Sequence, residues 1–340
     1  MRRFAPAAWL AALLSLTGCA ASPEDPSTFR YEGSTDAVPW TGKTFDDGDA
    51  FTFALFSDLT GGERPRVFEV AIAQLNLLRP EFVIGVGDLI EGGTTDEAQL
   101  AREWDSFDRR AGAARARLFY TGGNHDLTNP TMWAVYEQRY GARYYHFLYK
   151  DTLFLVLDTE DNTAEAQWKL HEIRDKMIAA VAAEGWGVFM ETEYGRLPAR
   201  RYGRVGEAQA DYFVEVIGRN PGVRHTFVIL HKAVWEQEAE QEFARVEAAL
   251  ADRPYTVFYG HEHSYLHETR HGRDYIRLGT TGGVQNPRKD MAIDHVSLVT
   301  VSETGVDIAN LRLSGIFGKD GRIPLDGDDL CFDVRACGGQ

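Results

Sequence analysis

The segments Phe82-Val-Ile-Gly-Val-Gly-Asp88 and Leu118-Phe-Tyr-Thr-Gly-Gly-Asn124 each join a short apolar run directly to polar residues. Runs of this length, rich in β-branched and aromatic residues and bounded by Gly, are typical of buried strands. In an open α/β sheet, ligands bind at the carboxyl ends of the strands. The two segments therefore predict a sheet with polar side chains gathered along one edge.

Three further strand-like runs end in the same way, and the residues behind them are Asp58, His231, His261 and His263. Carboxylate, amide and imidazole groups are the ligands that suit divalent transition metals. A chain that places such groups at successive strand ends would gather them in one place. A metal-dependent enzyme is therefore the leading interpretation.

Strand-like runs alternate with helix-like segments through most of the chain. Residues 67–78, 97–110 and 207–217 show apolar residues at helical spacing. Beyond about residue 275 the chain becomes rich in strands. Alternating units followed by strands favour a sheet-on-sheet core with helices outside. We expect an α/β fold, a two-sheet β-sandwich flanked by helices.

The chain is acidic, with a formal net charge of -15 at pH 7. Such an excess repels polyphosphate backbones unless a local basic patch overrides it. Long nucleic acid is therefore disfavoured as a partner, whereas a small phosphoester substrate is compatible with this charge.

Residues 1–18 are expected to be a targeting signal, because two arginines precede a short apolar run. The run ends in Leu16-Thr-Gly-Cys19, which resembles a bacterial lipoprotein cleavage box. This resemblance implies a lipidated Cys19 that anchors the chain to the bacterial envelope. Ala20 behind it suggests the outer membrane, with the protein facing the periplasm. The alternative is an ordinary secretory signal with Cys19 near the cut by coincidence.

The rest of the chain divides into three parts. Residues 19–49, rich in Ser, Pro, Thr, Gly and Asp, are expected to be a flexible tether. Residues 50–315 would form the main domain and residues 316–340 a C-terminal tail. In an oxidising periplasm, Cys331 and Cys337 of this tail are expected to form a local disulfide. A second metal site or a reactive thiol is the alternative, which their separation from the ligand-bearing segments disfavours.

Residues 161–203 exceed what a minimal core needs. They contain two helix-like segments and lead into a basic run that includes Arg200, Arg201 and Arg204. One interpretation is a cap over the active site, with these arginines holding substrate phosphate. The alternative is a solvated surface excursion.

The motifs Gly-Asp, Gly-Asn-His-Asp and Gly-His-x-His, which end at Asp88, Asp126 and His263, occur in a definite order. This ordered set resembles the calcineurin-like metallophosphoesterase family, and the resemblance covers roughly residues 50–313. It implies the family's αββα fold. It also implies hydrolysis of a small phosphomonoester or phosphodiester at a dinuclear metal site.

The resemblance further implies a ligand set for two divalent ions, Mn, Fe or Zn, with Asp88 as the bridging carboxylate. The first site would add Asp58 and His263, and the second would add Asn124, His231 and His261. Two ions about 3.5–4 Å apart can clamp a phosphoryl group while generating hydroxide near neutral pH to attack phosphorus.

His125 and Asp126 form a catalytic pair in this pattern and are not ligands. His125 would stabilise the transition state or protonate the leaving oxygen, with Asp126 orienting the ring. A lone Asp behind a strand is most often a helix N-cap. The hypothesis therefore depends on the ordered set and not on any single residue.

The first motif departs from the family pattern Asp-x-His, because this chain has Asp58-Leu-Thr60. A threonine hydroxyl is a poorer ligand than imidazole. We therefore expect the first site to bind metal more weakly than the second, or to use water or Glu63. The departure also permits an alternative function, a binding lipoprotein with the same fold and a degenerate first site. The presence of His125 and Asp126 argues against it.

Overall fold

The computed structural model describes residues 48–237 and 240–338. The expected targeting signal, with Cys19, and nearly all of the expected tether lie outside the described residues. Among the described residues, no helix is long and apolar enough to cross a membrane.

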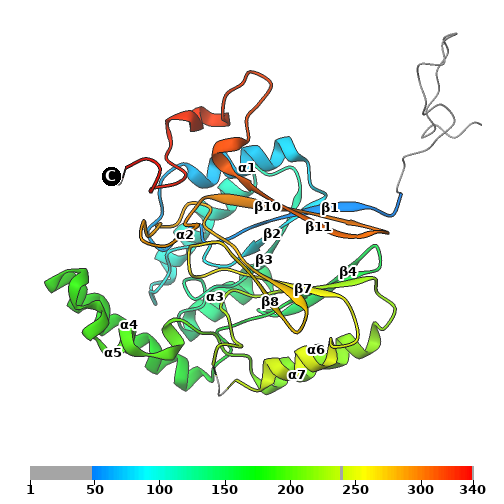
Figure 1. Cartoon of the computed structure of the whole chain (residues 1–340). Helices are drawn as coiled ribbons and strands as arrows, with labels where there is room; N and C mark the ends of the chain where they lie inside the picture. The colour runs from blue at the N-terminus through cyan, green and yellow to red at the C-terminus, as the bar shows by residue number, and fades with distance from the viewer. Residues whose placement is uncertain (1–47, 238–239, 339–340) are drawn as a thin grey trace, which may run out of the picture. The chain divides into compact units, whose positions relative to one another are not determined.

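Two mixed sheets form the centre of the domain (Figure 1). The first contains, in spatial order, β11 (Gly305–Arg312), β10 (His295–Ser302), β1 (Phe51–Phe56), β2 (Phe82–Val86) and β3 (Arg117–Thr121). The second contains β4 (Tyr145–Tyr149), β5 (Thr152–Val156), β6 (His225–Ile229), β7 (Tyr255–Tyr259), β9 (Arg273–Arg277) and β8 (Leu266–Arg270). Strands β1 to β3 are parallel to one another, as are β5, β6, β7 and β9.

The helices are α1 (Val67–Leu78), α2 (Glu97–Ala111), α3 (Pro130–Tyr140), α4 (Ala164–Glu184), α5 (Glu193–Arg196), α6 (Glu207–Arg219) and α7 (Glu242–Ala249). Short 3-10 turns are η1 (Trp186–Glu191), η2 (Pro198–Arg200), η3 (Leu313–Gly315) and η4 (Pro324–Asp329). The predicted helix over residues 67–78 coincides with α1, because its apolar residues recur at helical spacing and face the first sheet.

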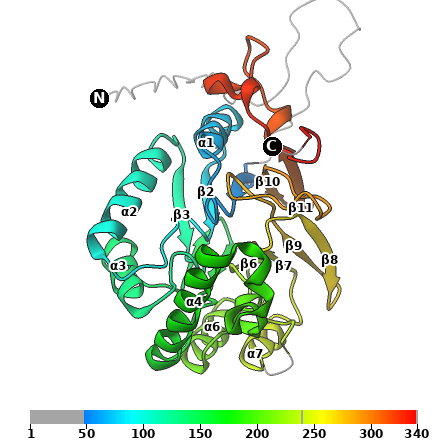
Figure 2. The same cartoon turned by 90° about the vertical axis from the view of Figure 1, so that its left-hand side faces the viewer.

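Aromatic side chains fill the space between the two sheets. Phe53 of the first sheet lies edge-on to Phe154 and Phe227 of the second, with ring centroids 5.2 and 4.9 Å apart. Helices α1, α2 and α3 pack on the outer face of the first sheet, and α6 and α7 pack on the second (Figures 1 and 2). Strands with both faces covered must be apolar throughout, which explains the uninterrupted runs in the sequence. The predicted two-sheet fold flanked by helices is confirmed.

Residues 161–203 form a helical insertion that contains α4, η1, α5 and η2. Its two ends meet, because Glu160 and Arg204 pair as an isolated parallel bridge and the Arg204 N–H donates to Thr159 O at 2.8 Å. Helices α4 and α5 lie beside the two sheets and not within either layer (Figure 1). Closure of this segment over the site stays a prediction.

The tail beyond β11 packs against α1. The Gln74 side chain in α1 donates to Leu313 O and Ile316 O, both at 2.7 Å. Cys331 and Cys337 of the tail are joined by a disulfide. The Arg64 guanidinium donates to Cys331 O at 2.8 Å and pairs with buried Asp294 at 2.5 Å, so the tail is fastened to the segment before α1.

Candidate metal centre

The predicted ligands come together at the carboxyl ends of five parallel strands. Asp58, Asp88, Asn124, His231 and His261 follow β1, β2, β3, β6 and β7 within three residues of the strand end in each case. The first three belong to one sheet and the last two to the other. The centre therefore lies where the two sheets meet.

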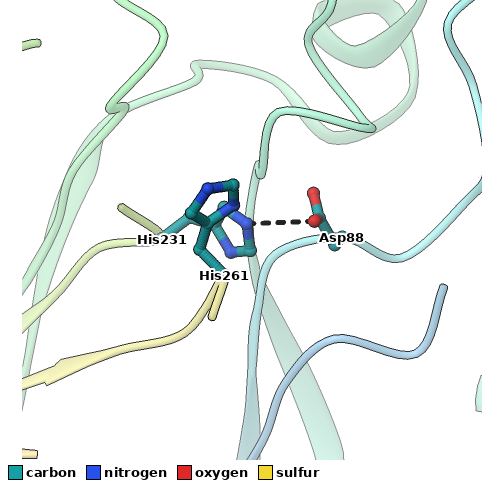
Figure 3. Close-up of side chains that lie close together, drawn as sticks. All are labelled: Asp88, His231 and His261. Carbon is teal, nitrogen blue, oxygen red and sulfur yellow. Dashed lines mark ion pairs between the residues drawn. The ribbon is translucent and has the colours of Figure 1, made fainter. Parts of the chain in front are cut away.

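Asp88, His231 and His261 form one candidate metal group, whose ligand atoms all lie within 4.8 Å of one another (Figure 3). His231 Nε2 is 3.1 Å from Asp88 Oδ2. The other ring nitrogen, His231 Nδ1, donates to Val86 O at 2.8 Å, and His261 Nε2 donates to Arg200 O at 2.9 Å. A carbonyl oxygen only accepts, so each imidazole carries a proton on that side and turns its other nitrogen toward the group. Burial opposes a charge on both rings and lowers the pKa of His261 well below its usual value. At His231 the facing Asp88 carboxylate outweighs burial and raises the pKa to about 9, so this ring gives up its Nε2 proton when it binds a metal.

Three buried atoms at this group have no hydrogen-bond partner within the described ranges: Asn124 Oδ1, His231 Nε2 and His261 Nδ1. An orphaned buried acceptor costs about 1–3 kcal/mol and calls for a partner that the protein itself does not supply. An amide oxygen, two imidazole lone pairs and a carboxylate together suit a divalent ion. The second predicted ligand set fits a metal on these grounds.

Asp58, Asp88 and His263 form the other candidate group, also within 4.8 Å. His263 Nδ1 donates to Val284 O at 2.6 Å, and its Nε2 lies 3.3 Å from Asp58 Oδ1. The Asp58 carboxylate is held by the His261 N–H at 3.0 Å and by the Ser57 hydroxyl at 2.6 Å. Asp88 is common to both groups, as a bridging ligand requires.

Thr60, where the family pattern has a histidine, is buried, and its N–H donates to Asp88 O at 3.2 Å. Its hydroxyl oxygen has no hydrogen-bond partner among the residues that the structure describes. The Glu63 carboxylate pairs with Arg110 of α2. The use of water or Glu63 by the first site stays a prediction.

Four of the proposed ligands have left-handed backbone conformations: Asp58 (φ 53°), Asp88 (φ 56°), His261 (φ 74°) and His263 (φ 52°). Such conformations cost non-glycine residues about 1–3 kcal/mol each and cluster at functional sites. They turn the chain sharply behind each strand and aim the side chain across the sheet edge.

Two glycines of the sequence motifs are required because the backbone at these positions passes very close to ligand side chains. A Cβ at Gly123 would lie 2.3 Å from Asp88 Oδ1, and one at Gly87 would lie 2.5 Å from His231 Nδ1. Neither neighbour can withdraw, because each belongs to the candidate metal group. These glycines let the backbone pass directly beside the ligands.

The charge of Asp88 is fixed by its surroundings. Burial opposes ionisation, but the neighbouring His231 and His125 outweigh it and hold the pKa of this carboxyl well below its usual value. The His125 N–H also donates to Asp88 Oδ1 at 2.8 Å. Asp88 is therefore an anion near neutral pH, as a carboxylate between two cations must be.

The predicted role of Asp126 is corrected by its contacts. Its carboxylate accepts from the N–H groups of Leu89 at 2.9 Å, Ile90 at 3.1 Å and Gly123 at 2.8 Å, and not from His125. Burial together with the charge of Asp88 raises the pKa of Asp126 to about 7. Asp126 thus fastens the loop behind Asp88 to the loop that carries Asn124.

Glu91 holds the His125 ring instead. His125 Nδ1 donates to Glu91 O at 2.8 Å, and the Glu91 carboxylate lies 3.8 Å from the same nitrogen. The Glu91 carboxylate also accepts from the N–H of Gly62 at 2.8 Å, in the loop after Asp58. The position of Glu91 in the loop behind Asp88 is the only sequence signal that could have indicated its contact with His125.

The arginines predicted to hold phosphate are used differently. Arg201 lies 3.4 Å from Glu262 and 3.9 Å from Glu236, so acidic side chains already balance its charge. Arg200 places its guanidinium over the Phe189 ring, and only its backbone carbonyl reaches the centre. Arg204 is exposed at the end of the insertion.

Arg174 of α4, which the sequence did not single out, lies against the loop that follows β2. A Cβ at Gly93 would lie 2.2 Å from Arg174 Nη1, so the guanidinium lies against the backbone of the loop that holds His125.

Comparison with known proteins identifies the class. A model of the calcineurin-like phosphoesterase family matches residues 51–265, and the chain therefore belongs to this family of dinuclear metal-dependent enzymes. A dimetal phosphatase from Danio rerio is similar in structure, with a TM-score of 0.53 and 14% sequence identity over 77% of this chain and 96% of that chain.

Purple acid phosphatase PPD1 from yellow lupin (Lupinus luteus) seeds is similar as well, with a TM-score of 0.50 and 12% identity over 79% of this chain and 52% of that chain. At these identities the likeness extends to the fold. No curated protein matches the sequence.

Replacing Asp126 by Ala should lower the free energy of unfolding by about 3 kcal/mol, because up to three buried N–H groups lose their acceptor. Urea unfolding followed by circular dichroism measures the change. Asp252→Ala, at an exposed position, is the matched control and should change stability by less than about 0.5 kcal/mol. If the Asp126→Ala protein kept its stability but its His125 ring were displaced, Asp126 would orient His125 as first predicted.

Introducing an imidazole at the first site, by Thr60→His, should raise its affinity for Mn²⁺. Calorimetric titration of both proteins measures the stoichiometry and the two affinities. Thr60→Val, which replaces only the hydroxyl with a methyl group, shows whether the hydroxyl is a weak metal ligand or does not contact the metal. Equal stoichiometry and affinity in all three proteins would remove the argument that position 60 limits this site.

Proposed function

We propose that this protein hydrolyses small phosphoesters, monoesters or diesters, with two divalent ions of Mn, Fe or Zn held by the two groups that share Asp88. The observation that supports this is the set of three buried ligand atoms around that anionic carboxylate, which have no hydrogen-bond partner among the described residues. The ions, when bound, would polarise phosphoryl oxygens and lower the pKa of water to supply a nucleophile.

The ligands proposed for this role differ in charge. Asp88 lies between the groups as the shared anion, and Asp58 adds a second negative charge on the first-site side. Asn124 and the two histidines of the second group would bind a metal as neutral donors, His231 after losing the proton that Asp88 favours. The second group thus carries less negative charge per ligand, while the first has fewer protein donors.

His125 is proposed to move a proton. With its Nδ1 donating to Glu91 O, the Nε2 atom is free to serve the reaction. A Cβ on Gly61 would lie 3.6 Å from His125 Nε2 and 3.1 Å from His263 Cε1, so the two rings flank one glycine. His125 Nε2 therefore faces the first-site side, where it can donate to a departing alkoxide.

The alternative proposal is a binding protein of the same fold with a degenerate first site. Thr60, a buried hydroxyl where an imidazole would complete the ligand set, is the observation that favours it. The proton-transfer geometry of His125 favours the enzyme, because a binding protein has no need of a free Nε2 beside the ligands.

We also propose that the chain is exported and anchored to the bacterial envelope, at the outer membrane, by a lipid on Cys19. Two observations support this localisation. The segment before Cys19 has the lipoprotein pattern, and Cys331 and Cys337 form a disulfide of the kind that persists in oxidising compartments.

Turnover of p-nitrophenyl phosphate and of bis(p-nitrophenyl) phosphate tests the hydrolase. Activity on at least one ester should vanish with a chelator and return with Mn²⁺. His125→Ala should reduce kcat by about 10²–10⁴-fold while the bound metal is unchanged. Two bound ions without turnover of either ester, across several metals, would favour the binding protein.

Replacing Cys19 by Ser tests the anchor. The wild-type chain should sediment with the membranes of an expressing bacterium, and Cys19→Ser should move to the soluble fraction. Metabolic labelling with a radioactive fatty acid should mark only the wild type. An unlabelled wild-type chain in the soluble fraction would indicate an ordinary secretory signal.

A further inference from the structure

The end of the insertion, residues 197–204, is fastened to the two loops that carry the second-site histidines. One loop follows β6 and begins at His231, and the other follows β7 and begins at His261. The contacts are specific and partly buried. They raise the question of what this segment contributes to the centre.

Lys232, directly behind His231, is one fastening point. It is 1% exposed, which is rare for a lysine, and its ammonium lies 2.8 Å from the carboxylate of Glu160, itself 3% exposed. The same ammonium donates to Ala199 O at 3.0 Å. Burying such a pair is costly, and it is often no more stabilising than an apolar pair of similar volume. Its geometry therefore points to a role in specifying the position of Ala199.

The next carbonyl along the chain, that of Arg200, accepts from His261 Nε2 at 2.9 Å. This bond sets the tautomer, because it places the proton on Nε2 and leaves His261 Nδ1 as the lone-pair nitrogen. Nδ1 is the atom that lies in the candidate metal group without a partner in the described part of the chain.

Two more contacts fix the same segment. The Arg201 guanidinium lies 3.4 Å from Glu262, between the two histidines of the Gly-His-x-His motif. The Gly203 N–H donates to Ala233 O at 3.1 Å, in the loop of His231. Segment 197–204 thus touches both ligand loops and cannot shift without disturbing them.

We propose that Lys232 is a positioning residue of the second metal site: by holding Ala199 it presents the Arg200 carbonyl to His261 and so selects the ligand tautomer. This inference rests on the proposed metal site. It assigns to the insertion a part in metal binding that is separate from any closure over the substrate. Groups that orient metal-binding histidines in this way typically contribute 10–100-fold in metal affinity.

The test uses the double variant Lys232→Met/Glu160→Gln, which removes both charges together and leaves no lone buried carboxylate. Calorimetric titration of the full chain with Mn²⁺ measures the dissociation constant of each site. The constant of the second site should rise 10–100-fold, and that of the first site should be unchanged. Lys176→Met, an exposed lysine of α4, is the matched control and should retain both wild-type affinities.

The tautomer of His261 provides a second readout, and its wild-type measurement does not depend on the variant folding. Long-range ¹H–¹⁵N spectra of the metal-free wild-type chain should show the His261 proton on Nε2, and the double variant should populate the Nδ1–H form. A wild-type proton on Nδ1, or a folded double variant with both Mn²⁺ affinities unchanged, overturns the inference. A wild-type chain that binds no Mn²⁺ contradicts the proposed function instead.

Discussion

The carboxylate of Asp88 is the point on which the rest of the centre depends. It is fully buried between two sheets, faces His231, and accepts the N–H of His125. It also belongs to both candidate metal groups. A buried anion of this kind is costly without positive charge around it. The left-handed turns behind the strands and the bare glycines beside it all serve to bring donors close to this one group.

Much of this arrangement could be predicted from the sequence, because strand ends obey a simple rule. Apolar runs bounded by Gly locate the strands, and parallel strands deliver whatever follows them to a common edge. This rule predicts from the sequence alone that Asp58, Asp88, His231 and His261 lie at a common edge. Likewise, the helical spacing of α1 fixed both its ends, since its apolar face has one sheet to cover.

Contacts decided by loops could not be predicted in this way. Asp126 and Glu91 are both acids near His125, and only the path of the loop after Asp88 determines which of them the imidazole meets. The arginines at the end of the insertion illustrate the same limit, because local acids such as Glu262 neutralise Arg201. Arg174 of α4 lies against Gly93 in the loop after β2. Sequence spacing carries no information on these pairings.

The placement of the centre across both sheets has a consequence for how the chain acquires it. Asp58, Asp88 and Asn124 follow strands of the first sheet, whereas His231 and His261 follow strands of the second. The first sheet also includes β10, which comes after all of these residues in the chain and pairs with β1. The full set of proposed ligands is therefore complete only when both sheets have formed and packed together, so metal binding would be coupled to folding of the whole domain.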